Sequence, residues 1–208
     1  LIISGSGKYF CIGMDIDFLG ACFADPKNTF SAFVTRYHEL LHRIEEANIP
    51  VIAAVNGIAR AGGIELLLAC DLVVISNEAK IGDHHLASGI PPGAGAGVRL
   101  QRILGPIRAR EFIFSARWMS ADEAFQSGVA SHVCAPDQLE VIIDQIVDNL
   151  SRTSRTALAA TKSALLQASP TRPGCKAELK VFLDFVTNDP DASEGYRAWV
   201  EKRSPQWK

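Results

Sequence analysis

Two short apolar segments constrain the fold of this chain more than any other feature. Residues 51–55 (VIAAV) are apolar throughout, and residues 71–76 (DLVVIS) contain a second apolar run. Runs of this length are typical of strands that are buried on both faces of a parallel sheet. Between them, Gly62 and Gly63 open a helical segment, and parallel strands need such a crossover connection. The sequence therefore predicts a mainly α/β core with parallel strand pairing.

The chain divides into two parts at about Pro136. Before it, strand-like residues 1–4 and 129–134 alternate with helical patterns, and a polar loop is expected up to about Asp25. After it, four amphipathic helical patterns follow in series: 139–150, 156–167, 176–186 and 193–201. We expect a core of residues 1–135 and a C-terminal helical segment of residues 136–208. These helices carry more apolar surface than one core can cover, so a homotrimer or homohexamer is predicted.

Composition and charge narrow the classes of partner. The formal net charge is −2 and the Lys and Arg residues are scattered, which argues against a nucleic-acid surface. The five cysteines are widely spaced, without the spacing of a zinc site or a disulfide framework. No apolar run is long enough to cross a membrane. We therefore expect a cytoplasmic protein with no metal, no membrane anchor and no nucleic acid.

Several short motifs occur in the order and at the spacing of one enzyme family. They are residues 10–15 (FCIGMD), 55–71 (VNGIARAGGIELLLACD), 89–95 (GIPPGAG), 99–105 (RLQRILG), 120–124 (SADEA) with 128–129 (GV), and the tail motifs 194–195 (EG) and 199–203 (WVEKR). With these motifs the chain resembles the enoyl-CoA hydratase/isomerase family, the crotonases, over nearly its whole length. The resemblance implies a crotonase-type ββα spiral core with a C-terminal helical trimerisation segment. It also implies an acyl-CoA thioester substrate, with coenzyme A as part of the substrate and no separate cofactor. Because the chain begins inside a strand-like run without Met, we expect the N-terminal part of the family fold to be missing.

The glycine motifs suggest how a thioester enolate would be stabilised. Enolate formation places negative charge on the carbonyl oxygen, which two fixed backbone N–H groups can accept. Gly62 opens a helix, where N–H groups are unpaired, and it has no Cβ to obstruct a ligand. The resemblance implies that the second N–H belongs to Met14, which follows Gly13, and that Gly13 lies against the substrate. In the alternative interpretation these glycines serve only turns and packing.

Glu65 and His85 are the predicted catalytic side chains. Glu65 matches one of the two acidic residues that a family hydratase uses, although a carboxylate near a helix N-terminus can also be purely structural. At the second acidic position the chain departs from the family and has His85. An imidazole can act as a general acid or base near neutral pH. Its neighbours Asp83 and His84 either orient His85 or only line the loop.

The histidine leaves the reaction open. His85 has a counterpart in 6-oxocamphor hydrolase, a crotonase relative that cleaves carbon–carbon bonds of β-diketones without CoA, but that enzyme has an Asp where Ala94 stands here. In the tail, Trp199 and Lys202 match positions that contact CoA in the family, or they form an ordinary terminal helix. We expect a hydratase or isomerase of acyl-CoA. The alternatives are a carbon–carbon hydrolase that uses His85 and a catalytically silent assembly subunit.

Overall fold

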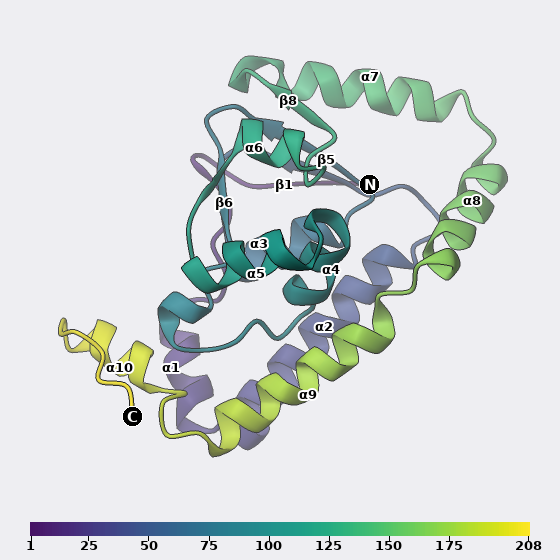
Figure 1. Cartoon of the computed structure of the whole chain (residues 1–208). Helices are drawn as coiled ribbons and strands as arrows, with labels where there is room; N and C mark the ends of the chain where they lie inside the picture. The colour runs from purple at the N-terminus through teal and green to yellow at the C-terminus, as the bar shows by residue number, and fades with distance from the viewer.

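The computed structural model describes residues 1–208, and its strands form two sheets (Figure 1). The first sheet is parallel throughout and has the order β1 (Ile2–Ser4), β3 (Ile52–Val55), β5 (Leu72–Ser76), β8 (His132–Cys134). The second has the order β2 (Tyr9–Cys11), β4 (Ile58–Arg60), β6 (Lys80–Gly82), β7 (Met119–Ser120), and only its β6–β7 pair is antiparallel. The predicted parallel pairing is confirmed.

Four short helices pack with these sheets around the main core. They are α3 (Gly62–Leu68), α4 (Ala96–Leu104), α5 (Pro106–Ser115) and α6 (Ala121–Gln126). The core cluster includes Ile64 of α3, Leu100 of α4 and Phe112 of α5, all fully buried. Ser120 caps the start of α6, because its hydroxyl accepts a hydrogen bond from the Glu123 N–H at 3.2 Å. Between β6 and α4, residues 83–95 contain only one regular turn, the 3₁₀ turn Leu86–Ser88.

The segment before the first long helix differs from the expected loop. It forms α1 (Ile16–Ala24), then a π-helical turn (Pro26–Phe30), and then α2 (Ser31–Glu45). The Asp15 carboxylate caps α1 by accepting the Phe18 N–H at 3.0 Å. Phe23 of α1 then packs against Phe30 with ring centroids 5.3 Å apart. The expectation of a loop was wrong here because tertiary packing stabilises this mostly apolar helix.

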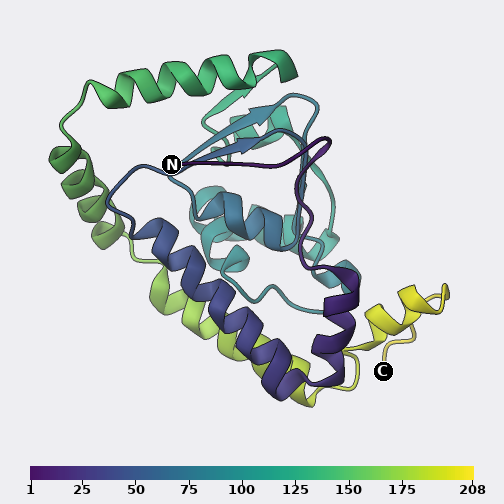
Figure 2. The same cartoon turned by 180° about the vertical axis from the view of Figure 1, so that it is seen from behind.

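The C-terminal segment is helical, as predicted, and consists of α7 (Leu139–Ser151), α8 (Arg155–Ala168), α9 (Arg172–Asn188) and α10 (Glu194–Val200). α7 packs on the first sheet through Leu139 and Ile143. α8 has no buried residue, and Lys162 links it to Asp71 at 2.7 Å. α9 runs beside α2, and α10 returns to lie beside α1 (Figures 1 and 2). None of the helices combines the length and the hydropathy that a membrane span needs.

Candidate active site

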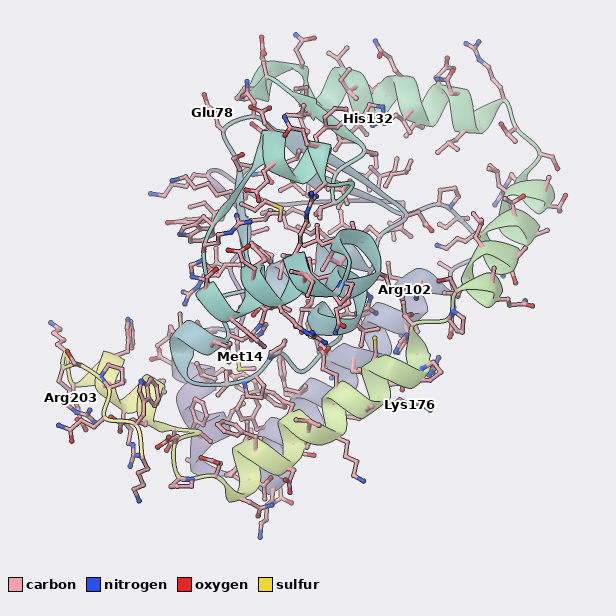
Figure 3. All side chains as sticks on the ribbon, in the orientation of Figure 1. Met14, Glu78, Arg102, His132, Lys176 and Arg203 are labelled. Atoms are coloured by element: carbon pink, nitrogen blue, oxygen red, sulfur yellow. The ribbon has the colours of Figure 1, made fainter.

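A cavity of about 350 Å³ lies where β2, α1, α2, α3 and α10 meet. Its wall is largely apolar and includes aromatic side chains from several elements: Phe23, Phe30, Phe33, Tyr37, Phe182 and Tyr196. The predicted site residues that line it are Gly13, Met14, Gly62, Glu65, His85 and Trp199. Lys202 is not among them and is exposed in the tail. Figure 3 shows Met14 beneath the core helices, whereas Arg203 lies at the outer end of the tail.

Two backbone loops touch at one side of this cavity. Gly13 follows β2 with a φ of +98°, a conformation that favours glycine. Gly62 is the first residue of α3, so its N–H has no helical carbonyl one turn earlier. A Cβ added to Gly13 would lie 3.6 Å from the Gly62 nitrogen, and one added to Gly62 would lie 3.6 Å from the Gly13 Cα. The structure thus places the loop that carries Met14 directly against the start of α3.

The peptide at the start of α3 is held from both sides. Ala61, its N-cap residue, has φ +51° and ψ −118°, which an L-residue rarely adopts. Its N–H donates to the carbonyls of Gly82 and Asp83, each at 3.1 Å. On the other side the Tyr37 hydroxyl donates to the Gly62 carbonyl at 2.5 Å. Burial, followed by the charge of Glu65, raises the pKa of Tyr37, so its hydroxyl remains a donor.

Glu65 and His85 face each other across the cavity wall. Glu65 is only 3% exposed, and its Oε1 accepts the Ala94 N–H at 2.7 Å. Its Oε2 lies 4.0 Å from the Nε2 of His85. Burial raises the pKa of Glu65 despite the opposing effects of His85 and the Ala94 N–H. The structure therefore brings the two predicted catalytic side chains together, with the carboxylate in an environment that favours proton uptake.

Asp83 is the residue that orients His85. It is fully buried, its Oδ2 lies 3.1 Å from the His85 Nδ1, and its Oδ1 accepts the His85 backbone N–H at 3.3 Å. Burial lowers the pKa of His85, but the charges of Asp83 and Glu65 outweigh it and raise this pKa to about 9. At neutral pH the imidazole is therefore protonated and directs one N–H at each carboxylate. His84 instead lies against the Trp118 ring, with centroids 4.1 Å apart.

Two side chains outside the predicted site, Arg99 and Glu178, hold the turn that carries Ala94. The buried Arg99 donates to the Ala94 carbonyl at 2.8 Å and to Glu45 at 2.9 Å. Glu178 of α9 accepts the N–H groups of Gly95 at 2.6 Å and Val98 at 3.1 Å. Burial, followed by the charge of Glu65, raises the pKa of Glu178 to about 7. Sequence analysis missed both residues, although one signal was present.

That signal is the position of Glu178 within its helix. It follows Cys175 by three residues and precedes Phe182 by four, and both of these side chains are buried. A carboxylate inside such an apolar stripe indicates a specific partner in the interior. The pattern would have identified Glu178 as a structural anchor, but not which turn it holds.

Comparison with known sequences identifies the family. The family profile described as enoyl-CoA hydratase/isomerase matches residues 1–208. The crotonyl-CoA hydratase of Syntrophomonas wolfei is 35% identical over 207 residues, which cover 98% of this chain and 78% of that protein. The 2,3-dehydroadipyl-CoA hydratase of Escherichia coli is 32% identical over 209 residues, which cover 100% of this chain and 80% of that protein.

Solved structures give the same result for the fold. The enoyl-CoA hydratase of Bacillus anthracis superposes with a TM-score of 0.76 at 32% identity, covering 100% of this chain and 80% of that one. The enoyl-CoA hydratase of Mycobacterium avium subsp. paratuberculosis superposes with a TM-score of 0.84 at 27% identity, covering 100% and 79%. These matches confirm the predicted crotonase-type α/β fold with C-terminal helices. The chain belongs to the enoyl-CoA hydratase/isomerase family, within the crotonase superfamily.

Proposed function

We propose that this chain is a hydratase or isomerase that binds an acyl-CoA thioester and moves protons with Glu65 and His85. The observation that carries the proposal is the 4.0 Å approach of these two side chains on the wall of the cavity that Gly13 and Gly62 also line. The similar proteins named above are hydratases of CoA thioesters. Water addition and double-bond migration change no oxidation state, so the reaction needs no cofactor beyond the CoA of the substrate.

The proposed oxyanion hole consists of the N–H groups of Met14 and Gly62. A thioester oxygen between the two loops would become more negative as the enolate forms. Each fixed donor is worth about 3–4 kcal/mol in such sites. The clamps on Ala61 and on the Gly62 carbonyl support this role, since they fix the Gly62 peptide before a ligand arrives. Gly13 leaves room for the thioester, and Trp199 at the cavity wall is positioned to contact the rest of the ligand.

The proton chemistry follows from the charges of the pair. At neutral pH His85 carries a proton. Glu65, whose pKa is raised by burial, is assigned as the proton acceptor. During hydration one of them takes a proton from the attacking water while the other gives a proton to the α-carbon. The pair has one transferable proton before and after the reaction. After each turnover this proton passes from the residue that took it back to the residue that gave one. During isomerisation the same acceptor removes a proton from one carbon and a donor returns one to another.

His85 should determine how well this site adds water to a thioester. Two carboxylates grip one water molecule as two acceptors, whereas a protonated imidazole offers a donor instead. We therefore expect weak hydration of crotonyl-CoA by the native protein. His85→Glu restores a second carboxylate, so it should raise crotonyl-CoA hydration while it reduces the protein's own reaction.

Steady-state hydration of crotonyl-CoA by the native, His85→Ala and His85→Glu proteins across pH 5 to 9 tests this proposal. A broader screen of acyl-CoA thioesters should reveal a substrate that native protein processes better than either variant does. Strong native hydration that His85→Ala leaves unchanged would mean that His85 only lines the loop. The mechanism would then depend on Glu65 alone.

A second candidate is a carbon–carbon hydrolase of the 6-oxocamphor hydrolase type. The observation that favours it is the buried Asp83–His85 pair at 3.1 Å, which supplies the carboxylate that Ala94 lacks. Assays of a cyclic β-diketone beside crotonyl-CoA discriminate between the two. Diketone cleavage without thioester binding would select the hydrolase, and thioester binding without turnover across the screen would select a silent assembly subunit.

The exposed α8 supports a proposed homotrimer or homohexamer. None of its residues is buried within the chain, and Leu165 is 68% exposed. A second copy could cover such a surface. Light scattering at micromolar concentration should give a mass of three or six chains, and a strictly monomeric mass would contradict the proposed assembly.

A further inference from the structure

One cation in the interior of this chain lacks a carboxylate partner. Five Arg or Lys side chains are buried or half-buried: Arg60, Arg99, Arg117, Lys162 and Arg172. Four of them pair with carboxylates at 2.5–2.9 Å. Arg60 has no carboxylate within the 4.0 Å of an ion pair, so its charge is not balanced by the chain itself.

Arg60 lies in the wall of the active-site cavity. It is the last residue of β4, where the preceding Ala59 is fully buried in the core. Because side chains alternate along a strand, Arg60 projects to the other side, where it lines the cavity. It stands two residues before Gly62. The cation is therefore beside the region in which the acyl part of a thioester would lie.

The guanidinium is poorly satisfied there. A guanidinium has five N–H donors. The Arg60 side chain makes one long contact, from Nη2 to the Ser88 hydroxyl at 3.4 Å, and its Nε is buried without a partner. Ser88 also lines the cavity. A buried donor without a partner is costly, so this arrangement favours a ligand that brings its own acceptors.

The charge balance of the cavity points to an anion. His85, the other cation, lies between Asp83 and Glu65, which offset its charge. The remaining wall is mostly apolar and aromatic, so electrostatic attraction is weakly screened there. A carboxylate matches the planar guanidinium through two parallel hydrogen bonds. The Ser88 hydroxyl, which donates only a long 3.5 Å bond to the His84 carbonyl, can turn to donate a third.

We propose that Arg60 and Ser88 bind a carboxylate at the far end of the acyl group, so that the substrates are CoA thioesters of dicarboxylic acids. This inference rests on the proposed function, because it assumes that the thioester lies at Gly62. The CoA phosphates are the other anionic groups of the same ligand, and the experiment separates them from the carboxylate.

The test compares saturated thioesters that differ only in the end group. Adipyl-CoA and hexanoyl-CoA have six acyl carbons, and further pairs span four to eight carbons. Calorimetry with native protein should show about 10- to 100-fold tighter binding of the dicarboxylic member of the best pair. Arg60→Met should abolish this ratio, and Arg60→Lys should keep part of it as a point charge. The control Arg108→Met removes an exposed cation of α5 and should keep the native ratio.

Turnover provides a second readout. The kcat/KM ratio of 2,3-dehydroadipyl-CoA to hex-2-enoyl-CoA should fall by the same factor in Arg60→Met, and circular dichroism verifies the fold of each variant. Equal native binding within every pair would overturn the inference. The inference would also be overturned if Arg60→Met weakened the binding of both pair members and of free CoA to the same extent, because Arg60 would then bind a CoA phosphate. Native protein that binds no thioester and no CoA would instead contradict the proposed function itself.

Discussion

The cavity wall has a backbone side and a side-chain side: the loops of Gly13 and Gly62 present backbone groups, whereas Glu65 and His85, the latter held by Asp83 behind it, present side chains. The backbone side is held by the positive φ of Gly13 and Ala61 and by neutral hydrogen bonds to Ala61 and Gly62. The side-chain side is held by a balance of burial and opposite charges. Changes on the first side should therefore act through geometry, and changes on the second side through protonation.

The largest effect is expected on the side-chain side, from Glu65→Gln. The amide oxygen can still accept the Ala94 N–H, but it cannot take a proton. Loss of a general acid–base group costs about 10²–10⁴-fold in rate, so kcat for the best thioester should fall by that factor. Glu78→Gln is the matched control, since Glu78 is exposed and far from Met14 (Figure 3). Activity above a tenth of native in Glu65→Gln would remove Glu65 from the mechanism.

Gly62→Pro is the corresponding change on the backbone side. Proline deletes the N–H, and removal of one oxyanion donor costs about 10²–10³-fold in kcat. Gly62→Ala keeps the N–H, and its Cβ would meet protein atoms at no less than 3.6 Å, so any loss that it causes measures only how far a Cβ crowds the thioester. We expect steady-state kinetics to show a far smaller loss in Gly62→Ala. Full activity in a folded Gly62→Pro protein would refute the oxyanion assignment.

Asp83→Asn tests the charge balance without removing a catalytic group. If the protonated His85 is the proton donor, native activity should decline as pH rises through about 9. Removal of the Asp83 charge takes away a cause that raises this pKa, so the alkaline limb of kcat/KM should move down by about one to three pH units. An unmoved limb in Asp83→Asn would show that the limb does not report on His85.

The same pKa has a consequence for stability. The pKa of His85 is raised on folding, so its protonation stabilises the fold fully below about pH 6.5, the ordinary value of histidine. This contribution is lost as pH rises through about 9. Urea unfolding of native protein should therefore show a decline in stability over this interval that His85→Gln lacks. Parallel pH profiles for the two proteins would assign the decline to other groups.

The smallest effect is expected from Ala61→Gly, on the backbone side. A non-glycine residue in such a conformation costs about 1–3 kcal/mol, and glycine loses about 0.4–1 kcal/mol through the entropy of the unfolded chain. We expect a net gain of about 1 kcal/mol in the free energy of unfolding, measured with urea. Ala59→Gly, at the buried neighbour in β4, should be destabilising instead. A loss of stability in Ala61→Gly would show that Ala61 is unstrained.

The sequence could predict the features that depend on local residues, but not those that depend on contacts between distant ones. Residues 51–55 and 71–76 were predictable as strands because each contains a continuous apolar run, and Gly62 was predictable because a helix start needs no distant partner. α1 was not predictable, because its stability comes from packing against α9 and the π-helical turn.

In the candidate site, Asp83 was visible beside His85, but only the structure shows the 3.1 Å contact between them. Glu178 lies 83 residues beyond Gly95, so no local pattern could connect it to this turn. Arg99 stands only five residues after Ala94, but the sequence does not show that its side chain folds back onto the Ala94 carbonyl. The boundary at residue 135 stays a prediction.

The contact between Glu178 and the start of α4 also affects the order of events during synthesis. The acceptor of the Gly95 N–H lies 83 residues further along the chain. By the time α4 leaves the ribosome, Arg99 and its partner Glu45 have been made, but Glu178 has not. Both sheets, whose last strand is β8, can therefore pair while the Ala94 turn that binds Glu65 still lacks its contact with α9. The nascent chain should therefore become compact well before it becomes able to bind and process a ligand. A nascent chain arrested before α9 would be folded in its core yet inert.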